Sequence, residues 1–197
     1  MEAHEAHEMH EHADHHSAVD GRFKTRAALL VSVLAMLLAL ASLGGADATK
    51  EATHYNILAS NSYNFYQAKN IRQTAYKVAA DELEITLAKD DKLSAPAREL
   101  VQKKLDAYRK NIERYESEPD TGEGKKELMQ RAKAYEHERD IALRRDPWFD
   151  YAEALLQIGI VVASVAIITS TPLLLAGSLL LGIVGGLSAA NGFLLLI

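Results

Sequence analysis

The chain has 197 residues, no cysteine and a formal net charge of −5. Without cysteine it can form no disulfide, thiolate zinc site or thiol nucleophile, and it is not basic enough to predict nucleic-acid binding. A mean hydropathy near zero suits a soluble domain, but charged residues are absent from 27–46 and from 154–197. Such uncharged apolar runs predict membrane-spanning helices, which need about 20 residues to cross a bilayer core.

Residues 1–21 are predicted to form a disordered tail rich in histidine and carboxylates. Imidazole and carboxylate groups together suit zinc, nickel, copper or cobalt, and the candidate ligands are His4, His7, His10, His12, His15 and His16. Nothing in the sequence pre-organises a metal site, however. In a solvated tail such histidines are expected to titrate near the unperturbed histidine pKa of about 6.5. We therefore expect no cofactor, and metal binding by the tail is the weaker hypothesis.

Segment 22–46 is predicted to be the first transmembrane helix. Arg22, Lys24 and Arg26 precede its apolar run, an arrangement that also describes a cleavable signal peptide. The run is long for a signal-peptide core, and an acidic, histidine-rich leader is unusual before one. The sequence therefore favours a helix that is retained. Its basic flank places the N-terminal tail in the cytoplasm by the positive-inside rule.

Segment 47–146 is predicted to be an extramembrane helical stalk. Residues 46–150 contain 19 basic and 20 acidic residues. Two apolar stripes with helical spacing run along 49–89: one is Leu58, Phe65, Tyr76, Ala79 and Leu83, and the other is Ile57, Ala68, Ile71, Ala75, Val78 and Ile85. Apolar residues on two sides predict packing against several helices, including helices of other copies.

The rest of the stalk is predicted to run back toward the membrane. A break at 90–92 is followed by Ser94 and Pro96, which indicate a helix start. Apolar residues then repeat with heptad spacing: Val101, Leu105, Tyr108, Ile112 and Tyr115. A loop is expected at 118–124 and a further helix at 125–145. The outgoing and returning lengths match, which favours a long antiparallel hairpin over a compact three-helix bundle.

Asp146 and Pro147 predict the start of a new helix. The uncharged stretch that follows is too long for one crossing, and Ser170-Thr171-Pro172 divides it into transmembrane helices at 147–171 and 172–197. The predicted fold is therefore an all-α membrane protein. It has three transmembrane helices and a long antiparallel, coiled-coil-like hairpin inserted between the first and second, with the stalk outside the cytoplasm.

Two stretches carry a family resemblance: NSYNFYQAKNIRQTAYK at 61–77 and WFDYAEALLQIGIVVASVAIIT at 148–169. They resemble a bacterial inner-membrane family known as domain of unknown function 4337, and the apolar run ending LALASLGGA fits as well. The resemblance covers most of 20–197. It implies a three-helix protein of the inner (cytoplasmic) membrane with a helical soluble insert, and it implies no activity. With the tail in the cytoplasm, as the basic flank predicts, the stalk of such a protein lies in the periplasm.

Small residues recur in the last two apolar segments, where they predict close helix packing within one chain or between copies. They are Gly159, Ala163, Ser178, Gly182, Gly185, Gly186 and Ala190. Polar residues inside such segments are candidate functional groups: here they are Glu153, Gln157 and Asn191. Glu153 lies beside interfacial aromatic residues, where a carboxylate costs little.

No nucleophile elbow, dinucleotide fingerprint or complete P-loop is present, so we expect no enzymatic activity. The leading hypothesis is a self-associating integral membrane protein with a scaffolding or accessory role. Its expected partners are lipid and its own copies, bound through the stalk and the transmembrane helices. The alternative is an oligomeric ion channel or transporter with Glu153, Gln157 or Asn191 near the pore and the tail as a metal or pH sensor.

Overall fold

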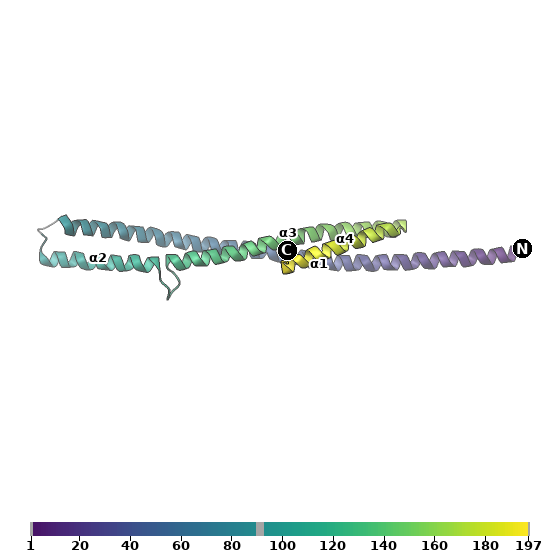
Figure 1. Cartoon of the computed structure of the whole chain (residues 1–197), viewed down its shortest axis with the longest axis horizontal. Coiled ribbons are helices and arrows are strands. Elements are labelled where there is room, and N and C mark those ends of the chain that lie inside the picture. The colour runs from purple at the N-terminus through teal and green to yellow at the C-terminus, as the bar shows by residue number, and fades with distance from the viewer. Residues whose placement is uncertain (1, 90–92, 197) are drawn as a thin grey trace. The chain divides into compact units, whose positions relative to one another are not determined.

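The computed structural model describes residues 2–89 and 93–196, with side chains from residue 21 onward. Its regular structure is α-helical, in four helices (Figure 1): α1 (Glu2–Lys89), α2 (Ala95–Glu116), α3 (Lys125–Thr169) and α4 (Pro172–Leu194). The chain divides into two compact units. Unit 1 contains Met1–Glu51 and Ile141–Ile197, and unit 2 contains Ala52–Asp140.

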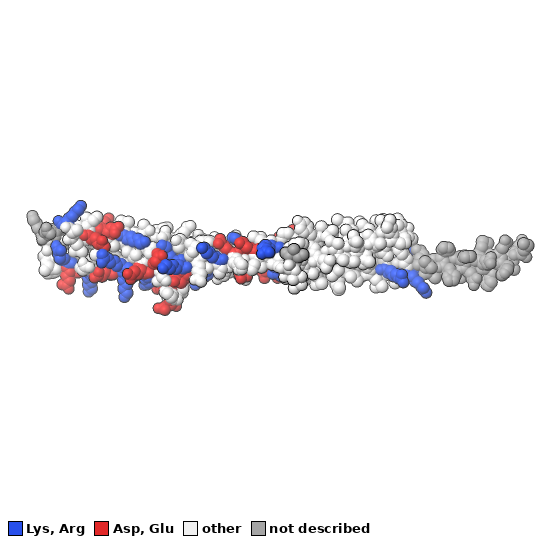
Figure 2. Space-filling view, in the orientation of Figure 1, with Lys and Arg blue, Asp and Glu red and all other residues white. Residues whose placement is uncertain are grey.

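Three of the described helices, α1, α3 and α4, are long and apolar enough to cross a membrane. Charged side chains cover the visible face of unit 2, whereas the apolar segments of unit 1 show an almost uncharged surface (Figure 2). The predictions of an all-α chain and of three membrane-length helices are confirmed.

The predicted boundary near residue 46 is not a break in the helix, because α1 continues through it as far as Lys89. Gly44 and Gly45 are both buried there, and the side chain of Phe149 packs against them. Burial compensates for the weak helix propensity of the two glycines. In unit 1, apart from these glycines, buried apolar residues of α1 recur every seven positions, at Ala27, Leu34, Ala41 and Ala48.

The predicted start of α2 and the predicted loop after it are confirmed. Ser94 is the N-cap residue and Pro96 lies in the first turn, while residues 117–124 form the connection to α3. Glu127 in the first turn of α3 holds that loop, because its carboxylate accepts hydrogen bonds from Ser117 Oγ at 2.6 Å and from the Glu118 backbone N–H at 3.2 Å. The break predicted at 90–92 lies outside the described residues.

The prediction of a helix start at Asp146-Pro147 is wrong, since Pro147 lies inside the continuous helix α3. A proline within a helix removes one backbone hydrogen bond and costs about 3 kcal/mol. Packing next to it offsets this cost, because Phe149 and Ala152 are both 0% exposed. Local sequence cannot report that burial, which comes from other helices.

The predicted division at Ser170-Thr171-Pro172 is confirmed. α3 ends at Thr169 and α4 begins at Pro172, with Thr171 as its N-cap residue. Ser170 takes the left-handed conformation, with φ of 50°, which reverses the chain between the two helices. Proline suits the first position of α4 because that position has no intrahelical partner for an N–H.

In unit 2, α1 packs against α2 and the first part of α3 through a single seven-residue repeat. The residues of this inner seam are all buried or half-buried: Ala52, Tyr55, Ala59, Ser62, Tyr66, Lys69, Gln73, Tyr76, Ala80, Leu83 and Leu87. Residues earlier in α1 contact residues later in the chain: Tyr76 of α1 pairs with Tyr108 of α2, and Tyr55 of α1 pairs with Tyr135 of α3. The paired segments therefore run in opposite directions (Figure 1).

In unit 1, three helices share an apolar core. Leu34 and Ala41 of α1, Ala152 and Leu156 of α3, and Ala189 of α4 form one buried cluster. Small side chains make up most of this cluster, so the helix backbones lie close together. This core positions the polar contacts described next.

Candidate functional site

The predicted small residues of α3 and α4 meet within one chain. Ser178 Oγ donates a hydrogen bond of 2.7 Å to the backbone carbonyl of Gly159. A Cβ at Gly159 would lie 3.4 Å from the Ser178 carbonyl oxygen, and Ala163 is 0% exposed. The helices therefore approach until a hydroxyl on one reaches a backbone carbonyl on the other.

The small residues later in α4 spread around the helix. Gly182 and Gly185 are buried against Leu34 and Leu156, respectively, whereas Gly186 is half-buried and Ala190 is exposed. A four-residue repeat advances about 40° beyond a full turn at each step, because a helix turns about 100° per residue. Ser178, Gly182, Gly186 and Ala190 are spaced four residues apart, so this row starts on the buried face at Ser178 and has left it by Ala190.

Sequence reasoning missed the aromatic packing in unit 1. Phe149 is 0% exposed, and its ring fills the space where side chains at Gly44 and Gly192 would lie. Phe193 contacts it edge to face, with ring centroids 4.8 Å apart. The adjacent glycines 44 and 45, in an otherwise apolar run, are the sequence signal that could have indicated a close approach.

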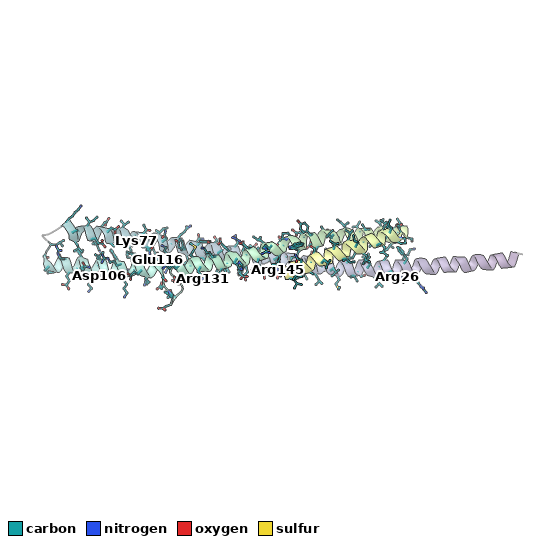
Figure 3. The ribbon with its side chains drawn as sticks, in the orientation of Figure 1. Arg26, Lys77, Asp106, Glu116, Arg131 and Arg145 are labelled. Atoms are coloured by element: carbon teal, nitrogen blue, oxygen red, sulfur yellow. The ribbon has the colours of Figure 1, made fainter. Side chains whose placement is uncertain are left out.

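Arg145 joins three elements of unit 1 (Figure 3). Its Nε donates to the Gly192 carbonyl at 3.1 Å and its Nη1 donates to Glu51 Oε2 at 3.2 Å. Gly192 lies in the last turn of α4, where backbone carbonyls lack helical partners and a cation is favourable. Nearby, Thr49 Oγ1 donates to Asp146 Oδ1 at 2.9 Å.

The three predicted polar membrane residues have different surroundings. Glu153 is half-buried and accepts a hydrogen bond of 2.8 Å from Ser42 Oγ. Gln157 is exposed. Asn191 is buried, and its Oδ1 accepts a hydrogen bond of 2.9 Å from the Leu196 backbone N–H. Asn191 thus helps to end α4.

Unit 2 contains a polar cluster within its helical packing. Gln73, only 1% exposed, donates through Nε2 to the Ile112 carbonyl and to Glu116 Oε2, both at 2.9 Å. Lys125 Nζ donates to Gln73 Oε1 at 2.9 Å and to Glu116 Oε2 at 3.2 Å. These bonds, from Gln73 first and then Lys125, hold the pKa of the Glu116 carboxyl below its usual range.

A groove of about 450 Å³ lies beside this cluster. Its lining residues are Tyr66, Glu116, Lys125, Lys126, Met129, Gln130 and Lys133. The Lys125 ammonium lies 5.6 Å from the centre of the Tyr66 ring. The groove is open, and its Lys125 charge is already paired with Glu116, so the geometry indicates helix packing more than recognition of a ligand.

The histidine side chains of the tail lie outside the described residues, so metal binding by His4, His7, His10, His12, His15 and His16 stays a prediction. Among residues 21–89 and 93–196, no group of three or more His, Asp or Glu side chains is placed to hold a metal ion. The chemistry that the described residues support is helix association.

A search of curated proteins and a search of solved structures each found no match to the chain. A comparison with protein families found a match over residues 23–195, which spans the apolar segments of unit 1 and the whole of unit 2. The chain therefore belongs to the family described as domain of unknown function DUF4337.

Proposed function

We propose that the chain is a non-enzymatic, self-associating integral membrane protein with a scaffolding or accessory role. In this proposal α1, the second part of α3 and α4 each cross the bilayer. Unit 2 then forms an antiparallel helical stalk in water. The uncharged segments and the charged surface of unit 2 support this division (Figure 2).

The observation that carries the proposal is the apolar surface that remains on α1 in unit 2. The inner seam is already covered by α2 and α3, yet Ile57, Ile71, Val78 and Ile85 are each more than half exposed. A contiguous apolar patch in water marks an interaction site on a protein surface. A membrane protein whose stalk carries such a patch is suited to assembly.

Self-association is tested by co-expressing two full-length copies with different affinity tags. The membranes are solubilised in mild detergent, one tag is captured, and the second tag is detected in the eluate. We expect the second tag to co-purify and native mass spectrometry to show oligomers. Co-purification that fails, together with monomers alone in native mass spectrometry, would refute the proposal.

We further propose the inner membrane of a bacterium as the location, with the tail in the cytoplasm and the stalk in the periplasm. The basic flank of Arg22, Lys24 and Arg26 before the first apolar run supports this orientation. A Lys77→Cys variant, exposed in unit 2, tests it on intact cells. We expect a maleimide that crosses only the outer membrane to label Cys at this position. Labelling only after lysis would reverse the orientation.

A channel or transporter is supported less well, because Glu153, Gln157 and Asn191 have separate surroundings. Flux of small ions across liposomes that contain the purified protein distinguishes the two classes. We expect no flux above that of protein-free liposomes. Flux that disappears in Glu153→Ala would favour the channel.

A further inference from the structure

The face of α1 that points away from α2 and α3 in unit 2, which we call its outermost position, carries mainly apolar side chains at a spacing of seven residues. Each lies about 170° around the helix from the inner seam, since a helix turns about 100° per residue. We call these residues the outer row, and all five are exposed: Ile57, Asn64, Ile71, Val78 and Ile85.

The other helices of unit 2 place polar residues at the equivalent position. On α2, whose own seam runs through Leu105 and Ile112, the outermost residues are Lys103 and Lys110. On the first part of α3, they are Gln130 and His137, and all four are exposed. Charged or polar residues are usual on the outer face of a helical hairpin in water. The outer row of α1 departs from this rule.

The exposed fractions show how much apolar surface the row leaves uncovered. Ile57 and Val78 are each 53% exposed, Ile71 is 69% exposed and Ile85 is 52% exposed. Ala68 and Ala75 lie between the row positions and are exposed as well. A seven-residue period over this length fits a second helix packed along α1, since a helical partner shares the period.

We propose that the outer row is the contact between two copies of this chain, with their α1 helices parallel and in register. The inference rests on the proposed function, because copies anchored in one membrane by the same segments point in the same direction. Each row residue then meets its own counterpart, and Ile57, Ile71, Val78 and Ile85 each bury their exposed surface against the same residue.

Asn64 provides an argument for the chain itself as the partner. It interrupts an otherwise aliphatic row, so its amide would be buried when the row is covered. In a parallel, in-register pair each Asn64 lies beside the other, and the two amides can satisfy each other. An Asn at such a position fixes register and limits the number of strands at a cost in stability. A partner that presents an apolar residue there would leave the amide unpaired.

The residues that flank the row do not oppose this arrangement. Two lines of residues border the contact, one at positions 58, 65, 72, 79 and 86 and the other at positions 60, 67, 74, 81 and 88. Their charged residues are Arg72 and Asp81. They have opposite signs and face uncharged residues of a parallel copy, so neither of these two residues forms a like-charged pair across the seam. Glu82, near the far end of the row, faces its own counterpart, and this repulsion weakens the association there without changing the register.

The absence of native cysteine makes single-cysteine cross-linking a clean test. Ile57→Cys, Ile71→Cys and Ile85→Cys sample the row, and residues 57 and 85 lie about 42 Å apart along the helix. Lys103→Cys and Lys110→Cys are matched controls at the outermost position of α2. Each full-length variant is oxidised in its native membrane and separated on a non-reducing gel.

We expect all three row variants to shift to the dimer band and both lysine variants to stay monomeric. An antiparallel pair would instead join residue 57 to residue 85, so neither end variant would cross-link with itself. That result, or equal cross-linking at Lys110→Cys, would overturn the inference. Row cysteines that are shielded from maleimide but form no dimer would indicate a different partner and would also overturn it.

A second measurement separates this inference from the proposed function. Ile71→Glu puts a charge into the row at an exposed position, so unit 2 should still fold, as circular dichroism can show. Lys110→Glu is the control. We expect Ile71→Glu to lose the dimer in native mass spectrometry while Lys110→Glu keeps it. Oligomers that survive Ile71→Glu refute the outer row but not self-association, whereas a wild-type chain that is monomeric refutes both.

Discussion

Phe149 occupies the space that a side chain at Gly44 would need. A Cβ built at Gly44 overlaps the Phe149 ring, and the ring also packs against Gly45 and Gly192. In a membrane, apolar burial gives little drive for helix association, so close van der Waals packing has to supply it. The contact between a glycine and a buried aromatic ring is therefore a main determinant of how α1 packs on α3 in unit 1.

Gly44→Val should destabilise the packing of unit 1. The added side chain must displace a ring that is 0% exposed, and overpacking of this kind costs about 1–3 kcal/mol. Gly177→Val is the control, because nothing lies within 4 Å of a Cβ at Gly177. Thermal unfolding in detergent should show a lower midpoint for Gly44→Val alone. Equal shifts in the two variants would mean that valine in a helix, and not the ring, causes the loss.

Ser178→Ala should weaken the contact between α3 and α4. It removes the buried hydrogen bond to the Gly159 carbonyl, and such bonds in membrane helices contribute about 0.6 kcal/mol on average. Ser164→Ala provides the comparison, since its exposed hydroxyl bonds only to the carbonyl of Ile160 in the same helix. Denaturation in mixed micelles should resolve a loss for Ser178→Ala and little change for Ser164→Ala. A larger loss of stability in Ser164→Ala than in Ser178→Ala would contradict a stabilising role for the bond between α3 and α4.

Arg145→Lys should loosen the end of α4. A guanidinium can reach the Gly192 carbonyl and Glu51 at once, whereas an ammonium keeps the charge but lacks the planar fork. Hydrogen bonds that involve a charged group contribute about 1.5–3 kcal/mol, so losing one of them is measurable. Arg144→Lys, at an exposed position, is the control. Amide hydrogen exchange should increase in the last turn of α4 for Arg145→Lys, and unchanged exchange would rule out this role.

The helix boundaries show what the sequence could and could not indicate. Pro172 was recognised as a helix start and Pro147 was mistaken for one. The two prolines look alike locally, because each follows a residue that can cap a helix. They differ in what surrounds them: Phe149 and Ala152 are buried by other helices, and their burial carries α3 past Pro147. Tertiary packing decides such cases, and local sequence does not contain it.

The faces of α1 show a second limit. Both apolar stripes have helical spacing, so periodicity alone could not tell which one faces α2. The inner seam includes Lys69 and Gln73, which a search for apolar residues passes over. Gln73 can be buried because Ile112 and Glu116 satisfy its amide, and those partners are known only once the helices are paired. The five-residue seam of α2, by contrast, was readable because all five residues are apolar or aromatic and all are buried or half-buried.

The stability of unit 2 should fall on acidification, with Glu116 as one cause. Hydrogen bonds from Gln73 and Lys125 lower the pKa of this carboxyl, and the bond from Ser117 does the same for Glu127. A carboxyl whose pKa is lower in the folded chain than in the unfolded chain stabilises the folded state. This stabilisation is complete at a pH above the pKa of the carboxyl in the unfolded chain, which is about 4.3 for glutamate. This stabilisation is lost as the pH falls through the lower, folded value.

Glu116→Gln isolates that contribution, since the amide keeps the size of the side chain and loses the charge that Lys125 faces. Urea unfolding followed by circular dichroism should find the variant less stable than wild type at pH 7. The difference should shrink as the pH falls below the range in which Glu116 is ionised in the folded chain, because wild type has then lost the same charge. Glu99→Gln, on the exposed face of α2, should follow wild type throughout. A Glu116→Gln chain with the wild-type dependence on pH would show that the cluster around Gln73 does not depend on this charge.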